Sequence, residues 1–163
     1  MAEFTCTRCG KCCISLGRHM RITKSTSPFS HTLYVSISKE TRPVLVEPGY
    51  RDLFLARSAP SYENGWCPFL RKTGDGIHVC TMYSSRPGVC RSFRCCTMRI
   101  FDIEGREIGK IKGRRSLSTT DPRLERVWSE EIVPLSALPD GEFFSRCGSV
   151  LAAHGFPCEL YDP

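Results

Sequence analysis

Four cysteines lie within eight residues near the start of the chain, in the run Cys6-Thr7-Arg8-Cys9-Gly10-Lys11-Cys12-Cys13. A gap of two residues lets a tight turn aim both sulfurs at one point, and it recurs in zinc and iron–sulfur sites. Gly10 suits such a turn because glycine tolerates positive φ. Hydrophobic packing alone does not require four cysteines within eight residues. The segment therefore predicts metal ligation rather than disulfides or an inert coincidence.

The adjacent cysteines Cys12 and Cys13 add a geometric constraint. Neighbouring side chains diverge by about 180° on a strand and by about 100° on a helix. We therefore expect the two sulfurs to reach one ion only with difficulty. They could serve two centres, or one could bind while the other packs behind it, so two metals or one polynuclear cluster stay open.

The composition is consistent with a small domain that depends on metal. The chain has 163 residues, of which 40% are hydrophobic, and metal crosslinks would compensate for a thin core. The net charge is +6, but thiolate centres are anionic and need nearby cations. Much of the basic excess is thereby explained without a polyanion, and nucleic acid is not an expected partner. The cations beside the cysteines are Arg8, Lys11, Arg86, Arg91, Arg94 and Arg99.

The cellular setting follows from the cysteine count and from two missing patterns. The 11 cysteines are an odd number, which excludes a complete intramolecular disulfide framework. No secretory signal pattern is visible at the N-terminus, and nothing approaches the roughly 18 apolar residues of a membrane span. The sequence therefore predicts a cytoplasmic protein with no membrane partner, in which clustered thiols indicate metal or redox chemistry.

A second group of cysteines lies between residues 66 and 96. The turn sequence at 73–76 separates two apolar runs, which predicts a hairpin that brings Cys67 close to Cys80. A short helix is expected from residue 87, where a proline suits the first turn. The hairpin and this segment could deliver Cys67, Cys80, Cys90 and Cys95 to the first group. Cys96 repeats the adjacency problem and is left out of the ligand set.

The remaining patterns predict an α+β fold, a small metal-stapled domain with short β-hairpins and several helices. Strands are expected at 33–37 and 44–46, a second hairpin at 99–111, and a continued helix at 14–23. Helices are expected from Asp121, ending before Pro134, and from Asp140, with Cys147 in the core. One domain is expected over residues 1–163, with a metal-binding core at about 4–96 and an extension at about 97–163.

Several residues beside the cysteines are candidates for supporting roles. His78 could replace a thiolate, although a hairpin histidine that faces solvent is the stronger expectation. Arg86 and Arg91 are expected to donate hydrogen bonds to sulfur, and Tyr83 is expected to pack against the site.

Taken together, the cysteine motifs resemble the CxxCxxCC family, the YkgJ-like cysteine-cluster proteins. The resemblance covers residues 4–96 and implies zinc or iron chelation, but no settled reaction. A flagellin lysine N-methylase resembles a member that carries this module, so an enzyme is also considered. The chain departs from the family in the insert between Cys13 and Cys67, in Cys96 and in its tail. The matching segments are 4–13, Cys67-Pro68-Phe69-Leu70, Cys80-Thr81-Met82-Tyr83, Arg86-Pro87 and Cys90-Arg91-Ser92-Phe93-Arg94-Cys95.

The expected metal ligands are eight cysteines: Cys6, Cys9, Cys12, Cys13, Cys67, Cys80, Cys90 and Cys95. Eight thiolates would fill two tetrahedral zinc sites. A single [4Fe–4S] cluster would take four and leave four for a second centre or a redox-active thiol pair. Zinc and an iron–sulfur cluster both stay open as cofactors.

Three classes of function fit these features, in decreasing order. The first is a binding or accessory module with a structural or redox-active metal, for which a protein partner stays open. The second is an iron–sulfur-dependent enzyme, such as one similar to a protein lysine N-methylase, that acts through a cluster with an exchangeable position. The third is nucleic-acid binding through the basic run at 110–115, which would show strongly salt-dependent affinity.

Overall fold

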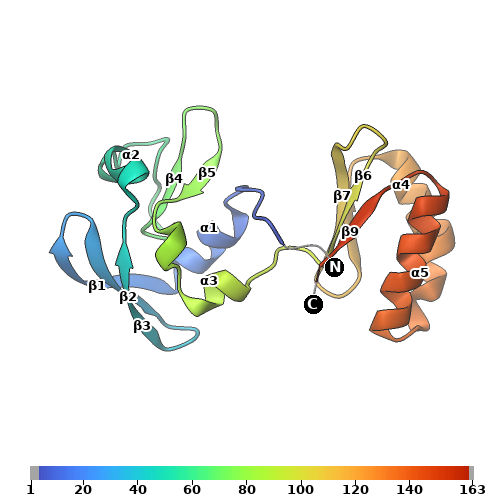
Figure 1. Ribbon diagram of the computed structural model, residues 1–163, viewed down its shortest axis with the longest axis horizontal. Coiled ribbons are helices and arrows are strands. Elements are labelled where there is room, and N and C mark those ends of the chain that lie inside the picture. Colours follow the sequence, from blue (N-terminus) through green and yellow to red (C-terminus); the bar gives the residue numbers. More distant parts are fainter. Residues whose placement is uncertain (1–3, 162–163) are drawn as a thin grey trace. The chain divides into compact units, whose positions relative to one another are not determined.

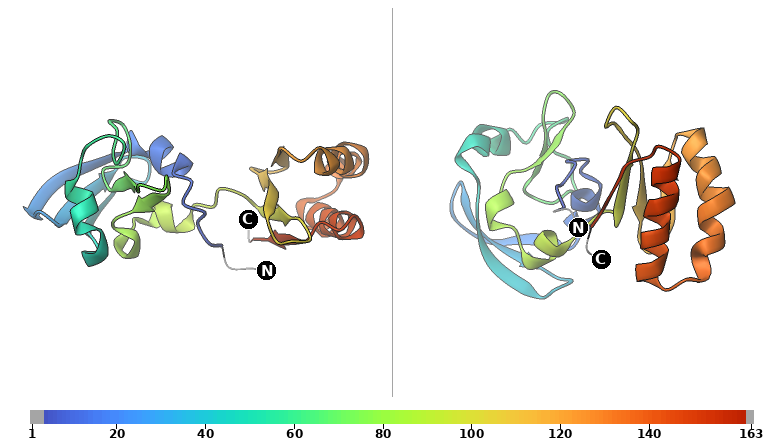
Figure 2. Two further views of the ribbon diagram at one scale, coloured as in Figure 1. Left: turned by 90° about the horizontal axis from the view of Figure 1, so that it is seen from above. Right: turned by 45° about the vertical axis from the view of Figure 1, so that its right-hand side comes forward.

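The computed structural model describes residues 4–161 (Figure 1). The chain divides into two compact units: an N-terminal unit, Cys6–Phe93, and a C-terminal unit that starts at Arg94 and includes Phe4 and Thr5. Each unit combines short helices with small antiparallel sheets (Figure 2), so the predicted α+β class is confirmed. The expectation that residues 1–163 act as one domain stays a prediction.

The N-terminal unit contains three short helices and five strands. Strands β1, β2 and β3 form one antiparallel sheet in that order, and β4 pairs with β5 in a second. Short 3-10 turns at Pro48–Tyr50 and Tyr83–Ser85 connect these parts. The elements are α1 (Lys11–Gly17), β1 (Met20–Ser27), β2 (Ser30–Val35), β3 (Glu40–Leu45), α2 (Arg51–Leu55), β4 (Leu70–Lys72), β5 (His78–Cys80) and α3 (Gly88–Ser92).

The core of the N-terminal unit forms on one face of the β1–β2–β3 sheet. Burial alternates along β2, where His31, Leu33 and Val35 face inward, as the two-residue period of a strand requires. Phe54 of α2 stacks on Phe69 with ring centroids 5.6 Å apart. Cys67 belongs to this core, and Cys13, Cys80 and Cys90 pack against it. The fold thus places four predicted ligands beside one hydrophobic cluster.

The C-terminal unit is a four-stranded antiparallel sheet with helices on one side (Figure 1). Its strand order is β8-β7-β6-β9, and Ile100 and Ile111 of the sheet pack with Leu124, Phe143 and Leu151 of the helices. No helix within residues 4–161 is long and apolar enough to span a membrane. The elements are β6 (Met98–Phe101), β7 (Glu107–Lys112), β8 (Ser116–Thr119), α4 (Pro122–Val127), a π-helical turn (Trp128–Ile132), a 3-10 segment (Val133–Ala137), α5 (Asp140–Ala153) and β9 (Cys158–Leu160).

Two of the expected helices differ from the observed ones. The helix expected over 14–23 ends at Gly17, and β1 begins at Met20. Pro134 does not end the helical run, which continues through Val133–Ala137, because proline is tolerated in the first turn of a new 3-10 segment. The expectation that Cys147 lies in the core is confirmed, since its side chain is fully buried.

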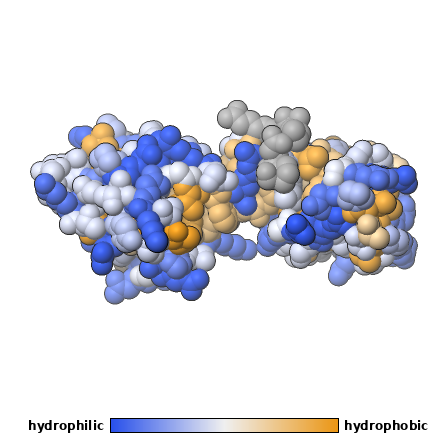
Figure 3. Space-filling model, turned by 90° about the horizontal axis from the view of Figure 1, so that it is seen from below, coloured by the Kyte–Doolittle hydropathy of each residue, from blue (hydrophilic) through white to orange (hydrophobic). Residues whose placement is uncertain are grey.

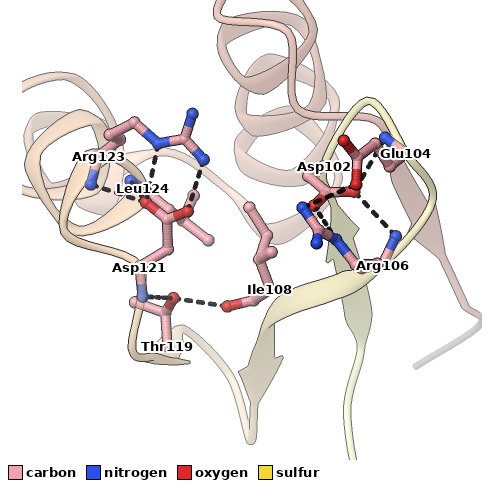
Figure 4. Close-up of polar contacts among 8 residues, drawn as sticks. All are labelled: Asp102, Glu104, Arg106, Ile108, Thr119, Asp121, Arg123 and Leu124. Atoms are coloured by element: carbon pink, nitrogen blue, oxygen red, sulfur yellow. Dashed lines mark hydrogen bonds and ion pairs between the residues drawn. The ribbon is translucent and has the colours of Figure 1, made fainter.

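Helix α4 begins at a cap that the sequence predicts. One carboxylate oxygen of Asp121 accepts hydrogen bonds from the backbone N–H groups of Arg123 (2.8 Å) and Leu124 (3.3 Å), and the Arg123 guanidinium binds the other oxygen at 2.8 Å (Figure 4). The Arg123 side chain and these amides lower the pKa of Asp121 to about 2. Asp121 thus fixes where the polypeptide leaves β8 and enters α4.

We expect Asp121→Ala to lower the free energy of unfolding by about 1 kcal/mol near neutral pH, the usual effect of losing an N-cap. The folded-state pKa lies below the ordinary value of 3.8, so the stabilisation is present above about pH 4 and is lost as pH falls through about 2. Chemical denaturation of the wild type and variant across this range would test it. Glu125→Ala removes a carboxylate from the same helix turn without a cap bond, and an equal loss in that control would contradict the prediction.

Candidate metal centre

The Cys6–Cys13 segment folds as a tight loop followed by a helix. The backbone N–H of Arg8 donates to the Cys6 sulfur at 3.4 Å, and Arg8 and Gly10 both have positive φ, 55° and 75°. A Cβ at Gly10 would lie 2.5 Å from the ring of His78. The backbone N–H of His78 also donates to the Arg8 carbonyl at 3.1 Å. The loop is therefore held against strand β5, and glycine is required at position 10.

The adjacent pair Cys12 and Cys13 lies in the first turn of α1, with its sulfurs 4.0 Å apart. The expected divergence of neighbouring side chains does not keep these sulfurs apart. The pKa of Cys12 falls to about 6 because its sulfur accepts a hydrogen bond from the Cys13 thiol. The same bond, together with burial, raises the pKa of Cys13. One member of the pair is thus ready to be a thiolate while the other holds its proton.

The far end of α1 is packed against the segment that carries Cys67. A Cβ at Gly17 would lie 2.2 Å from the Gly65 carbonyl oxygen, 2.3 Å from the Trp66 carbonyl carbon and 2.4 Å from the Cys67 nitrogen. The backbone N–H of Cys67 donates to the Cys13 carbonyl at 3.2 Å. Direct backbone contact therefore brings Cys67 close to α1. The sequence does not single out Gly17, because glycine is common at the ends of helices whether or not a neighbouring segment lies against it.

The hairpin β4–β5 and helix α3 bring in the other buried thiols. Leu70 pairs with Cys80 in the hairpin, as expected, and Cys90 lies in α3. Burial raises the pKa of Cys67 to about 12, of Cys80 to about 11 and of Cys90 to about 12. Cys80 and Cys90 add to the shift at Cys67, and Cys80 and Cys12 add to the shift at Cys90. These five thiols, Cys12, Cys13, Cys67, Cys80 and Cys90, are called the inner group below.

The residues expected to support the site behave differently from one another. The guanidinium of Arg86 lies over the Tyr83 ring, 3.4 Å from its centroid, and its charge opposes the pKa rise at Cys80 and Cys90. Arg91 instead donates to the backbone carbonyls of Arg86 (3.0 Å) and Ser84 (3.3 Å). The ring of His78 packs on Trp66 at 5.3 Å and is only partly exposed, so it does not simply face solvent.

A buried arginine, which no sequence motif marks, supports the loop before the hairpin. The Arg71 side chain is fully buried and donates to the carbonyls of Phe54 (2.9 Å), Pro68 (2.9 Å) and Leu70 (2.7 Å). Burial lowers its pKa to about 10, while the nearby Cys67 thiol acts in the opposite direction. Arg71 thereby ties α2 to the segment that presents Cys67.

The remaining predicted ligands are less closely gathered. Cys6 contributes to the raised pKa of Cys80, and both Cys6 and Cys9 are partly exposed in the N-terminal loop. Cys95 belongs to the C-terminal unit, so its place in the ligand set stays a prediction. Its neighbour Cys96 is buried in that unit, and burial raises its pKa to about 11.

The donor set of the inner group fits a thiophilic metal. Its members are sulfur donors from four parts of the N-terminal unit, and partners such as Arg86 stabilise negative charge. Among residues 4–161, no three His, Cys, Asp or Glu side chains are close enough together to hold a metal ion. Binding would therefore draw the thiols inward and release their protons.

The sequence of the segment that carries these cysteines matches a known protein family. The sequence model of the CxxCxxCC domain, to which zinc or iron chelation is ascribed, matches residues 5–98. The chain belongs to the CxxCxxCC family. No curated protein and no solved structure matches it. The match includes every cysteine of the predicted ligand set, and it supports metal binding as the function of this CxxCxxCC domain.

We expect Gly17→Ala to destabilise the CxxCxxCC domain by about 2 kcal/mol or more, because the new methyl group meets backbone atoms that have no room to move. Cys67 would shift away from Cys13, so the bound metal per chain should also fall. Thermal unfolding and elemental analysis of the purified variant measure both effects. In the control Gly49→Ala the Cβ meets nothing within 4 Å. If Gly17→Ala keeps wild-type stability and metal content, the packing argument is wrong.

Proposed function

We propose that the CxxCxxCC domain of this protein binds zinc through cysteine thiolates and that the metal is structural. The inner group supplies the centre of the site. Cys6, Cys9 and Cys95 complete the set of eight thiolates, which two tetrahedral zinc ions would fill. The site requires reduced thiols, so we place the protein in a reducing compartment, the cytoplasm.

The observation that carries this proposal is the burial of several thiols beside one another in a hydrophobic cluster. Cys67 is 4% exposed and lies in the core against which Cys13, Cys80 and Cys90 pack. Buried thiols of this kind can pack as small hydrophobic groups, but here several are gathered with neighbouring cations. A metal ion would supply the positive charge that lets buried thiols ionise.

Zinc is favoured over a [4Fe–4S] cluster by the Cys12–Cys13 pair. Two thiolates on one tetrahedral zinc are about 3.8 Å apart, given zinc–sulfur bonds of about 2.3 Å. The sulfurs of Cys12 and Cys13 are 4.0 Å apart. In a [4Fe–4S] cluster each of the four irons takes one cysteine, so an adjacent pair of sulfurs at this separation fits that centre less well.

A structural role follows from the positions of the inner group. Its thiols come from α1, from the segment before β4, from the end of β5 and from α3. The β4–β5 pairing is only three residues long, so backbone hydrogen bonds give these parts little support. Metal bonds would crosslink them. Zinc sites formed only by cysteine are typically closed to substrate, and the family match offers no support for activity like that of a lysine N-methylase.

We expect Cys80→Ser to lower the zinc content by about one ion per chain and to reduce thermal stability, because metal-binding energy is folding energy in such domains. The measurements are elemental analysis, a visible absorption spectrum and thermal unfolding, on protein purified without oxygen. The control Cys147→Ala changes a buried thiol of the C-terminal core and should leave the zinc content unchanged.

Three results would overturn this proposal. The first is a brown wild-type protein with iron and acid-labile sulfide, which would replace zinc by a cluster. The second is a colourless wild type without zinc. The third is a folded Cys80→Ser variant with the full metal content. If Cys80→Ser does not fold, stepwise removal of metal from the wild type by a chelator, followed by circular dichroism, tests the same coupling.

A further inference from the structure

The two units differ sharply in charge. The N-terminal unit has thirteen Lys and Arg against five Asp and Glu, so its formal net charge is +8. The C-terminal unit has ten against twelve, or −2. If all seven predicted cysteine ligands of the N-terminal unit were thiolates around two Zn²⁺, about +5 would remain. Thiolates therefore do not account for the basic excess of this unit.

The cations of the N-terminal unit also have few acidic partners. Within residues 4–161, the N-terminal unit has one ion pair between side chains, Arg42–Glu40, whereas the C-terminal unit has eight. Two acids of the N-terminal unit, Glu40 and Glu47, accept hydrogen bonds from backbone groups. Glu40 accepts from the Gly88 backbone N–H at 3.0 Å, and Glu47 accepts from Ser84 N–H at 2.8 Å. Glu40 and Glu47 thus hold backbone groups of the fold, and exposed cations of this unit such as Arg21 and Lys24 have no ion pair with them.

Part of this charge lies on the solvent-facing side of the β1–β2–β3 sheet. Arg21, Tyr34 and Thr41 are aligned across the three strands, and Lys24 is aligned with Thr32 in a parallel row. The alternate residues of β2 are buried in the core, so these side chains belong to the opposite face. Arg21 and Lys24 are exposed and Tyr34 and Thr32 are partly exposed. We call these residues the outer sheet face: Arg21, Lys24, Thr32, Tyr34 and Thr41.

The outer sheet face combines the groups that a single-stranded polynucleotide contacts. The Arg21 guanidinium lies 5.8 Å from the centroid of the Tyr34 ring, which places a cation beside an aromatic surface. Such pairs bind phosphate and stack a base. Hydroxyl groups surround them, and residues 18–45 contain five Lys and Arg but one acid, Glu40. Glu40 is aligned with the core residues Met20 and Val35, so it belongs to the inner face.

We propose that the outer sheet face binds single-stranded RNA or DNA, with Arg21 and Lys24 on phosphates and Tyr34 stacked on a base. The charge complementarity of this face selects a polyanion. A membrane surface would require an amphipathic apolar face, whereas the centre of this one is occupied by hydroxyl groups and Tyr34. Figure 3 shows mostly hydrophilic residues on the visible surface of the N-terminal unit, with separate smaller apolar patches among them. This proposal revises the expectation that nucleic acid is not a partner, and it does not depend on which metal is bound.

Fluorescence anisotropy of the metal-replete protein of 163 residues with labelled oligo-uridine and oligo-thymidine of roughly 15 nucleotides tests the proposal. The double variant Arg21→Glu, Lys24→Glu should weaken binding at least tenfold. It should also reduce the slope of log affinity against log salt by about 1.4, for two lost phosphate contacts. Tyr34→Ala should weaken binding about tenfold, and Tyr34→Phe should retain it. Metal content and circular dichroism confirm that each variant is folded.

The matched control is Arg126→Glu with Arg146→Glu, which changes the net charge equally on exposed positions of the C-terminal unit. It should leave the affinity within twofold. Four outcomes would overturn the proposal: no binding of either oligonucleotide at about 50 mM salt, an equal loss in the control, unchanged affinity in Tyr34→Ala, or binding of phosphatidylglycerol vesicles without binding of oligonucleotides. The ratio of the affinities for oligo-uridine and oligo-thymidine shows whether the outer sheet face prefers RNA or DNA.

Discussion

The contact between the end of helix α1 and the backbone of residues 65–67 is the constraint on which the cysteine site depends. Gly17 has no side chain, so the helix can approach until backbone meets backbone. The hydrogen bond from Cys67 N–H to the Cys13 carbonyl uses the same approach. Two cysteines more than fifty residues apart thereby become neighbours. The arrangement of these cysteines thus depends on close packing of the backbone.

Polar groups of the N-terminal unit fix loops more often than they join regular elements. Arg71 holds the carbonyls of Phe54, Pro68 and Leu70 from the inside, and Glu47 holds the turn at Ser84 from the outside. Such bonds satisfy backbone groups that short strands leave unpaired. They also place acids on amides rather than on cations, so a unit with many arginines contains few ion pairs.

Local patterns with a direct physical cause could be predicted from the sequence, and patterns that depend on distant contacts could not. The turn at 73–76, the Asp121 cap and the buried Cys147 follow from short-range chemistry and periodicity. Strand β1 cannot be predicted in this way because most of its residues are polar and exposed, so no alternation of hydrophobic residues marks it. The 4.0 Å separation of Cys12 and Cys13 depends on side-chain rotamers at the helix start, which spacing does not specify.

The raised thiol pKa values explain how one cysteine group can be both core and ligand. Cys67, Cys80 and Cys90 have pKa values of about 11 to 12, chiefly because of burial, so at neutral pH without metal they are neutral and pack as hydrophobic groups. A metal cation reverses the balance, since it stabilises the thiolates more than burial penalises them. Each thiol that becomes a ligand then gives up a proton. The same buried sulfurs can therefore pack as neutral groups or serve as metal ligands, and binding a metal there would add to the stability of the fold.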